Sequence, residues 1–339
     1  MKKIALILGI TGQDGSYLAE FLMKKKYLVH GIKRRTSTPN TIRIDHIFDS
    51  INFDNRKLIM HHGDLSDAGS LNRIINEINP DEIYNLAAQS HVKISFQIPE
   101  YTSDVNAMGP LRLLEIIRHY KKKKIKFYQA SSSEMFGKSK PPQNEKTLFQ
   151  PRSVYAISKV FAYYSVIHYR EAYNLHACNG ILFNHESPRR GVNFVTKKII
   201  QGLTRIKNGK QKILVLGNLY SRRDWGHAKD YVESMWRILQ RKKPDDYVVA
   251  TRTSHSVKDF INISAKKIGI KLIWKNKGLK EVGIDKTNNK TIITVNKKYF
   301  RETEVDDLIG DYSKAKRLLK WKPKYSFNAL VDDMIKNEK

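Results

Sequence analysis

The chain has 339 residues, 40% of them apolar, a composition that excludes a disordered protein and allows two domains with a sizeable core. Its formal net charge of +29 would suit a polyanionic partner, but the lysines are spread over the whole chain. The dense block Lys121–Lys124 lacks the interleaved aromatic residues and the motifs of nucleic-acid-binding proteins, so we expect no nucleic-acid partner.

The sequence offers no membrane or export signal. No apolar run approaches the roughly 20 residues that span a bilayer. The N-terminal run Ile4–Leu8 is too short for a signal peptide and leads into a glycine turn. The single cysteine, Cys178, excludes an internal disulfide and fits a reducing compartment. We expect a cytoplasmic protein that does not contact a membrane and has no metal site.

Up to about residue 184, short apolar strands alternate with amphipathic helices, which is the pattern of a parallel sheet covered on both faces. The predicted strands are Ile4–Leu8, Tyr27–Ile32, Leu58–Gly63, Glu82–Ala88, Lys126–Ser131 and Ala177–Asn184. The helix after the third strand can be capped by Ser66 or Asp67 and ends at Pro80. The helix over residues 103–119 accommodates Pro110 only if it is distorted or starts late.

The second half alternates less regularly. We predict helices near Phe194–Lys207, Lys229–Leu239, Ser256–Ile268, Glu304–Lys320 and Asn328–Lys336, and strands at Ile213–Leu216, Tyr247–Ala250 and Lys271–Trp274. The polar stretch Gly278–Lys290 is predicted to be a loop. Because there is neither a repeat nor a linker, any second domain must be built from insertions.

The predicted fold is therefore α/β, with a Rossmann-type doubly wound parallel sheet and a smaller, interleaved C-terminal domain. We assign residues 1–182, with a return near 218–250, to the sheet domain. Residues 183–217 and 251–339 then form the smaller domain.

A glycine-rich turn follows the first strand, with the sequence GITGQDG over residues 9–15. Glycines allow a tight turn and a close approach of the backbone to a pyrophosphate, and the next helix points its free N–H groups at the phosphates. The apolar strand before the turn and the amphipathic helix after it supply the required context. We predict a dinucleotide site of the short-chain dehydrogenase/reductase type; an ordinary glycine-rich turn is the alternative.

The second strand ends in Lys33-Arg34-Arg35, where an NAD site would place a carboxylate on the ribose 2′-hydroxyl. A guanidinium pairs with a 2′-phosphate through two charge-assisted hydrogen bonds, whereas a carboxylate would repel it. The sequence therefore favours NADP, and surface cations of a basic protein are the alternative. Asp64 and Leu65, after the third strand, can contact adenine.

A second group of residues suggests redox chemistry followed by an elimination. Tyr155 and Lys159 are four residues apart, on one face of a helix. An ammonium and a positive nicotinamide would lower the tyrosine pKa from about 10, so that the phenol acts as a base. Ser132, at the end of the fifth strand, can bond the same substrate oxygen. Glu134 can take a proton next to a newly formed ketone; a surface carboxylate is the alternative.

These motifs and several longer segments closely resemble the GDP-mannose 4,6-dehydratases, a family of extended short-chain dehydrogenases/reductases. The resemblance covers nearly the whole chain. Its segments are GITGQDGS (9–16), QASSSE (129–134), ACNGILFNHESPRRG (177–191), RDWGHAKDY (223–231) and YFR (299–301). Residues 179–191 are the most specific part.

The resemblance implies roles for individual residues. It places NADP against Gly9, Ile10, Thr11, Gly12, Gln13, Asp14, Gly15, Arg34, Arg35, Asp64, Leu65, Leu86, Ala87, Ala88, Gln89, Ser90, Tyr101, Lys159, His185 and Arg190. It makes Ser132, Glu134, Tyr155 and Lys159 catalytic. It assigns the GDP-sugar to Asn184, Lys198, Arg223, Arg301 and Glu304, with the arginines suited to the diphosphate.

The implied reaction converts GDP-D-mannose to GDP-4-keto-6-deoxy-D-mannose and water. Tyr155 takes the proton of the 4-hydroxyl while C4 passes a hydride to NADP⁺. Glu134 removes the proton at C5 and returns it as water leaves C6, and NADPH then reduces C6. Because the cofactor ends as it began, such an enzyme is a hydro-lyase. The resemblance also implies a homodimer or homotetramer that forms through the loop with the double arginine.

One residue departs from the family pattern, and three alternative functions remain open. Ser132 stands where the family usually has threonine, so the hydroxyl is kept and the methyl group that restricts it is lost. A nucleotide-sugar 4-epimerase would not need Glu134, and a dTDP-glucose 4,6-dehydratase usually has an Asp-Glu pair where this chain has Ser133-Glu134. A non-catalytic nucleotide- or polyanion-binding protein is disfavoured by the intact catalytic set.

Overall fold

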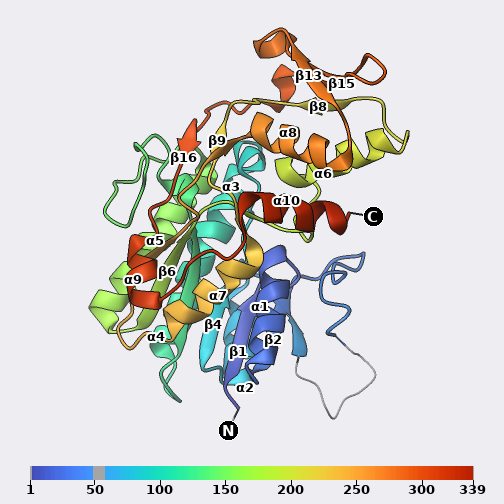
Figure 1. Cartoon of the computed structure of the whole chain (residues 1–339). Coiled ribbons are helices and arrows are strands. Elements are labelled where there is room, and N and C mark those ends of the chain that lie inside the picture. Colours follow the sequence, from blue (N-terminus) through green and yellow to red (C-terminus); the bar gives the residue numbers. More distant parts are fainter. Residues whose placement is uncertain (1, 49–57, 339) are drawn as a thin grey trace.

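The computed structural model of the protein describes residues 2–48 and 58–338. Its largest element is a sheet of parallel strands in the order β11-β6-β5-β4-β1-β2-β3 (Figure 1). The strands are β1 (Ile4–Leu8), β2 (Leu28–Lys33), β3 (Leu58–His62), β4 (Glu82–Asn85), β5 (Lys126–Ser132), β6 (His176–Leu182) and β11 (Tyr247–Val249). All neighbouring pairs are parallel, so the carboxyl ends of the strands meet at one edge. The predicted Rossmann-type sheet is confirmed.

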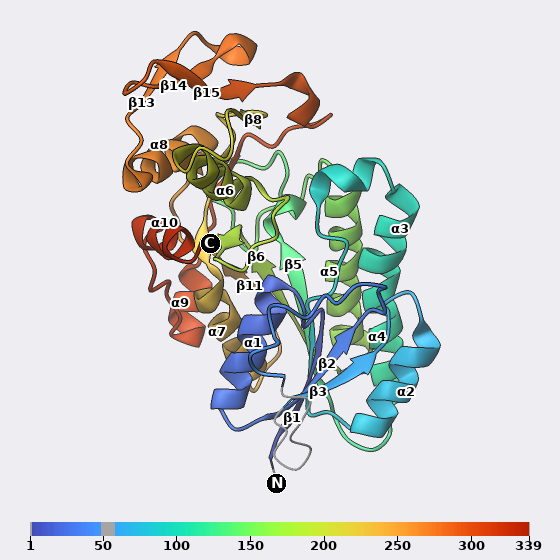
Figure 2. The same ribbon diagram turned by 90° about the vertical axis from the view of Figure 1, so that its right-hand side faces the viewer.

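Helices cover both faces of this sheet (Figure 2). One face carries α1 (Gln13–Lys24), α7 (Ala228–Leu239) and α9 (Ser313–Leu319), and the other carries α2 (Ala68–Ile78), α4 (Gly109–His119) and α5 (Val154–Tyr173). Along β1, Ala5 and Ile7 pack into the first layer, whereas Leu6 and Leu8 pack into the second. Because both faces are buried, the strand reads as an unbroken apolar run in the sequence.

A second layer lies beyond the carboxyl ends of the large sheet (Figures 1 and 2). Its sheet has the order β13-β14-β15-β8 and consists of β13 (Leu272–Lys275), β14 (Val282–Asp285), β15 (Lys290–Val295) and β8 (Leu214–Leu216). The helices α6 (Val195–Lys207), α8 (Val257–Ile268) and α10 (Phe327–Lys336) share one apolar core with β8 and β15. The layer is thus positioned to cover a ligand bound at the edge of the large sheet.

Short strands connect the two layers. They are β7 (His185–Glu186), which pairs with β10 (Gly226–His227), and β9 (Arg222–Arg223), which pairs with β12 (His255–Ser256) and β16 (Asp307–Leu308). The segment over residues 218–250 returns to the large sheet through α7 and β11. Helix α9, although it lies within residues 251–339, also packs on the large sheet.

Local signals placed several helix boundaries correctly. Asp67 caps α2 by accepting a hydrogen bond from the Ser70 nitrogen, and Ser256 caps α8 in a capping box with Asp259. The expected distortion near Pro110 is also confirmed. A short helix α3 (Pro99–Ser103) continues into a π-helical turn over residues 104–108, and α4 then begins with Pro110 in its first turn.

Two predictions for the second half were wrong. The stretch Gly278–Lys290 is not a loop, because it contains β14 and the start of β15, which pair in an antiparallel hairpin with a bulge at Gly283/Ile284. The helix predicted over Glu304–Lys320 begins only at Ser313, because β16 pairs with β9 before it. In the first place the two strands of a local hairpin define each other, and in the second the pairing with the distant strand β9 overrides local helix propensity.

Smaller differences concern strand ends. β4 ends at Asn85 and β6 at Leu182, where the chain leaves the sheet earlier than the apolar runs suggest. In the part of the chain that the structure describes, no helix combines the length and apolar character that a bilayer span requires.

Candidate active site

The turn after β1 leaves no space for side chains at two of its glycines. Gly9 adopts a φ of +78°, and a Cβ atom there would lie 2.9 Å from the Ala87 nitrogen. A Cβ atom on Gly15 would lie 2.4 Å from the Gly9 carbonyl oxygen. Gly12 is the N-cap of α1 and forms no side-chain cap, so the first-turn N–H groups remain directed off the helix end. The turn therefore fits a pyrophosphate, which needs close backbone approach and N–H donors.

The other residues of this turn connect it to the segment after β6. Ile10 is fully buried in the core, and the Thr11 carbonyl accepts a hydrogen bond from Arg43. Gln13 donates to the His185 carbonyl at 3.0 Å and accepts from the Ser187 hydroxyl at 2.8 Å. Sequence reasoning missed Ser187 because a contact between residues so far apart leaves no local pattern.

Asp14 and His185, which were predicted separately, form one partly buried ion pair. His185 Nε2 lies 2.7 Å from Asp14 Oδ2, and Nδ1 lies 2.7 Å from the Phe183 carbonyl oxygen. Burial opposes the charged imidazole, but the Asp14 carboxylate outweighs it and raises the pKa of His185. Arg190 lies close by, with Nε 2.9 Å from Glu186. Both ring nitrogens of His185 thus face acceptors, an arrangement that favours the protonated imidazole.

The loop after β4 contains a buried acceptor without a partner. Gln89 is fixed by two backbone hydrogen bonds with the Asn106 side chain, at 2.8 and 2.9 Å. Within residues 2–48 and 58–338, no donor contacts the buried Gln89 Oε1 atom. An unsatisfied buried acceptor costs about 1–3 kcal/mol, and this atom is free to accept a hydrogen bond from a bound ligand. Leu86, Ala87 and Ala88 are half-buried in the same loop, and Ser90 is exposed.

The structure brings two distant predicted residues together beyond β2. Arg34 Nη1 donates to the Tyr101 hydroxyl at 2.8 Å. Arg35 next to it is exposed. Asp64 accepts hydrogen bonds from the nitrogen and hydroxyl of Ser66, and the adjacent Leu65 is buried against Gly109. Two cations therefore lie near the β2 end, and an acidic residue lies near the β3 end.

The predicted catalytic residues converge where β5 ends and α5 begins. Ser132 is the last residue of β5, and its hydroxyl accepts a hydrogen bond from the Glu134 nitrogen at 3.2 Å. Tyr155 lies in the first turn of α5, where burial raises its pKa and the nearby Ser132 hydroxyl partly opposes that effect. Lys159 Nζ donates to the Ala130 carbonyl at 2.9 Å and lies 5.9 Å from the centroid of the Tyr155 ring. All four side chains are buried.

The polypeptide alone does not make Tyr155 a base at neutral pH. Burial raises its pKa to about 12, and this effect outweighs the Ser132 hydrogen bond. Burial also lowers the pKa of Lys159 to about 8. The lowered tyrosine pKa expected from the sequence therefore requires positive charge from a bound group.

Glu134 is not the surface carboxylate of the alternative interpretation, since only 7% of the residue is exposed. Arg301 Nη1 lies 3.4 Å from each of its carboxylate oxygens, and Arg223 Nε lies 3.9 Å from one of them. Burial alone would raise the pKa of Glu134, but the two arginines outweigh burial and lower it. A buried, ionised carboxylate thus lies beside Ser132 and Tyr155.

The residues predicted to hold the sugar nucleotide border the same region from the second layer. Lys198 Nζ lies 3.9 Å from the centroid of the Tyr299 ring, and burial lowers the lysine pKa. Glu304 accepts hydrogen bonds from the Arg301 nitrogen and the Ser221 hydroxyl, at 3.1 and 3.2 Å. Among the described residues, nothing donates to the buried Asn184 Oδ1 atom.

Comparisons with known proteins decide the family. The family model described as "GDP-mannose 4,6 dehydratase" matches residues 6–334. A GDP-mannose 4,6 dehydratase of Drosophila melanogaster is 56% identical over 98% of this chain and 85% of its own length. GDP-mannose 4,6 dehydratase 1 of Arabidopsis thaliana is 56% identical over 98% and 89%, and the Homo sapiens protein is 53% identical over 98% and 91%. The chain belongs to the GDP-mannose 4,6-dehydratase family.

Solved structures agree on the fold. UDP-glucose 4-epimerase of Thermotoga maritima matches with a TM-score of 0.80 and 21% identity, over 98% of both chains. A dTDP-glucose 4,6-dehydratase of Bacillus anthracis matches with a TM-score of 0.79 and 20% identity, over 99% of this chain and 96% of its own. At such identities the likeness shows the fold alone, so it gives no support to either of these activities as an alternative.

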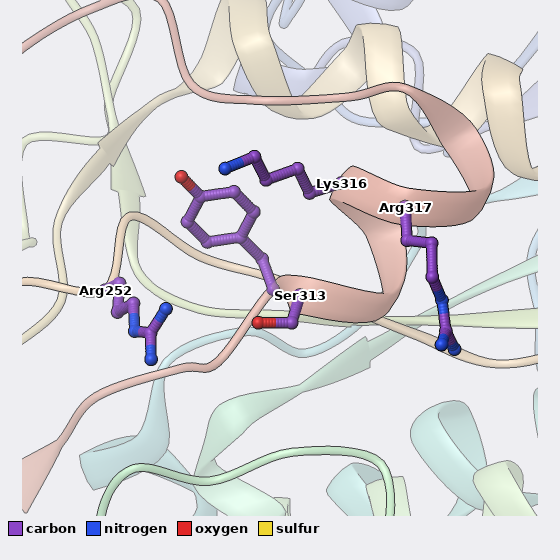
Figure 3. A pocket seen from close by; sticks show the side chains of 5 residues that line it. Arg252, Ser313, Lys316 and Arg317 are labelled. Atoms are coloured by element: carbon purple, nitrogen blue, oxygen red, sulfur yellow. The ribbon is translucent and has the colours of Figure 1, made fainter.

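A separate pocket of about 320 Å³ lies beside α9 (Figure 3). It is lined by Arg252, Tyr312, Ser313, Lys316 and Arg317, none of which belongs to the predicted site. Its lining contains no carboxylate and therefore no candidate base for the elimination.

Proposed function

We propose that this protein is an NADP-dependent GDP-mannose 4,6-dehydratase, a hydro-lyase that converts GDP-D-mannose to GDP-4-keto-6-deoxy-D-mannose and water. Family membership over residues 6–334 supports the activity. The observation that carries it is the buried carboxylate of Glu134, a residue whose backbone nitrogen donates to the Ser132 hydroxyl close to Tyr155. Simple alcohol oxidation needs no such carboxylate, whereas dehydration does.

The glycine turn, the loop after β4 and the His185–Asp14 pair hold the dinucleotide. The tight backbone at Gly9 and Gly15 and the unsatisfied Gln89 oxygen fit such a ligand. Arg34 and Arg35 suit a 2′-phosphate, and this favours NADP over NAD. When bound, the oxidised dinucleotide accepts a hydride from C4, later returns it to C6, and brings a positive charge into the site.

Ser132 and Tyr155 act on the hexose 4-hydroxyl. The Ser132 hydroxyl orients the oxygen, and Tyr155 takes its proton once added positive charge has brought the tyrosine pKa down from about 12. Lys159 stays fixed to the Ala130 carbonyl and supports the nicotinamide ribose. These residues produce a ketone at C4.

Glu134 carries out the elimination. The C4 ketone acidifies the C5–H bond, and the carboxylate takes that proton. It then gives the proton to the C6 hydroxyl, which leaves as water, so that Glu134 ends ionised as it began. When C6 is reduced, C5 regains a proton. This proton balances the one that Tyr155 took from the 4-hydroxyl.

The second layer binds the GDP-sugar. Arg223 and Arg301 hold the diphosphate, and Asn184, Lys198 and Glu304 complete the site from α6 and the loops beside β7 and β16. Residues 1–182 with the return near 218–250 form the dinucleotide domain, and residues 183–217 and 251–339, apart from α9 on the large sheet, form the GDP-sugar domain. The protein works in the cytoplasm as a homodimer or homotetramer.

Mass spectrometry of the reaction tests this proposal. The purified protein, incubated with NADP and GDP-mannose, should yield a product that has lost one water. Glu134→Gln should abolish that product, because the amide cannot accept the C5 proton. Glu302→Gln, which changes an exposed carboxylate on a nearby segment, is the matched control and should retain activity. Full dehydration by the Glu134 variant would remove the basis of the mechanism.

A further inference from the structure

The two arginines beside Glu134 differ in their freedom to move. Arg223 is only 6% exposed, and its Nη1 donates to the carbonyls of Arg222 and Val305, both at 2.8 Å. The Arg301 side chain is 27% exposed. Among the described residues, its guanidinium hydrogen-bonds only to Glu134. Arg223 is therefore fixed by the backbone, whereas the Arg301 guanidinium can move without breaking any hydrogen bond, among the described residues, other than those to Glu134.

The Arg301–Glu134 contact is long for its kind. Charge-assisted bonds between a guanidinium and a carboxylate measure about 2.7–2.9 Å, whereas both distances here are 3.4 Å. Arg301 is also proposed to hold the substrate diphosphate, which carries more charge than one carboxylate and offers several oxygen acceptors. A guanidinium with such long contacts to Glu134 is held weakly and is suited to transfer its hydrogen bonds to such a ligand.

Losing Arg301 would change the chemistry of Glu134. Burial raises the pKa of this carboxyl, and only the arginines bring it below its ordinary value. Three other titratable groups interact electrostatically with this cluster. The Glu134 charge acts on the Tyr155 phenol, and the Glu304 and Asp307 carboxylates act on Arg223. A carboxylate stabilised by two guanidinium groups is a weak base for a C–H proton, and one that is freed from Arg301 is a stronger base.

We propose that the substrate's diphosphate activates Glu134 by drawing Arg301 away from the carboxylate, so that the base becomes competent only when a nucleoside diphosphate sugar is in place. This inference rests on the proposed function. It makes Arg301 a positioning residue for Glu134 as well as a diphosphate ligand. It also gives a reason for selectivity, since a hexose that carries a single phosphate leaves Arg301 on the glutamate.

Infrared titration of the dinucleotide-loaded protein tests the inference, with GDP as a probe that supplies the diphosphate without a hexose. The wild-type spectrum minus that of Glu134→Gln isolates the carboxyl band. We expect GDP to move the titration midpoint of Glu134 upward by about one pH unit or more, whereas GMP, the matched probe with one phosphate, should move it much less. An unchanged midpoint with GDP, or an equal change with GMP, would overturn the inference.

A variant pair assigns the effect to Arg301. Arg301→Gln should titrate at the higher midpoint without GDP and respond little when GDP is added. Lys297→Gln, which removes an exposed cation from the same segment, should behave like the wild type. A wild-type response in Arg301→Gln would show that Arg301 is not the switch. Turnover of GDP-mannose by the wild type is measured separately. Dehydration without a GDP-dependent change in the Glu134 midpoint refutes this inference alone. Absence of dehydration refutes the proposed function.

Discussion

The two sides of the candidate site are built in different ways. The dinucleotide side is formed by backbone and by short contacts at strand ends, such as the 2.7 Å pair between His185 and Asp14. The proposed sugar side is formed by long side chains from distant segments, with contacts of 3.4 and 3.9 Å to Glu134. The difference indicates that the first side is preformed, and that the second side is completed by its ligand.

Tyr155→Phe should separate the two sides most clearly. The ring remains and the acid–base group is lost, so we expect turnover to fall by about 10²–10⁴-fold while NADP binding stays unchanged. Single-turnover assays and dinucleotide titration by fluorescence measure the two effects. A large loss of NADP affinity would show that the phenol belongs to the structure of the dinucleotide side.

Arg35→Asp tests the cofactor preference on the preformed side. The carboxylate should repel a 2′-phosphate and accept a 2′-hydroxyl, so NADP affinity should fall by about tenfold or more while NAD affinity holds or rises. Calorimetric titration of both cofactors against one variant provides the internal control. If both affinities changed equally, the 2′-phosphate would not lie at Arg35.

The His185–Asp14 pair predicts a smaller, pH-dependent effect. Its raised folded pKa makes His185 contribute stability that is present below pH 6.5, its ordinary pKa, and is lost as pH rises through the folded value. Despite burial, His185 lowers the pKa of Asp14, whose contribution is present above pH 3.8 and is lost as pH falls through the folded value. His185→Gln should remove the loss of stability that His185 causes as pH rises, which we expect to be on the order of 1 kcal/mol. Urea unfolding of variant and wild type across pH measures this difference. Parallel curves for variant and wild type would contradict the prediction.

The sequence alone predicted those parts whose signals are local. The turn at Gly9–Gly15 lies between an apolar strand and an amphipathic helix, and Tyr155 and Lys159 are one helical turn apart, so short-range patterns were sufficient. The arginine contacts of Glu134 could not be predicted in this way, because Arg301 lies 167 residues away. The hairpin within residues 278–295 was missed because β14 is short and the turn over residues 286–289 is polar, so the two strands are defined mainly by their pairing.

The contribution of late chain segments to the first sheet has a consequence for biosynthesis. β11, α7 and α9 all come from beyond residue 227, and Trp321 is buried in the same core, where its indole nitrogen donates to the Asp230 carbonyl. The part of this sheet face that α1 does not cover therefore stays exposed until these later segments have been synthesised. Truncation of the chain before Trp321 should leave apolar surface of the N-terminal strands uncovered and make the shortened protein prone to aggregation.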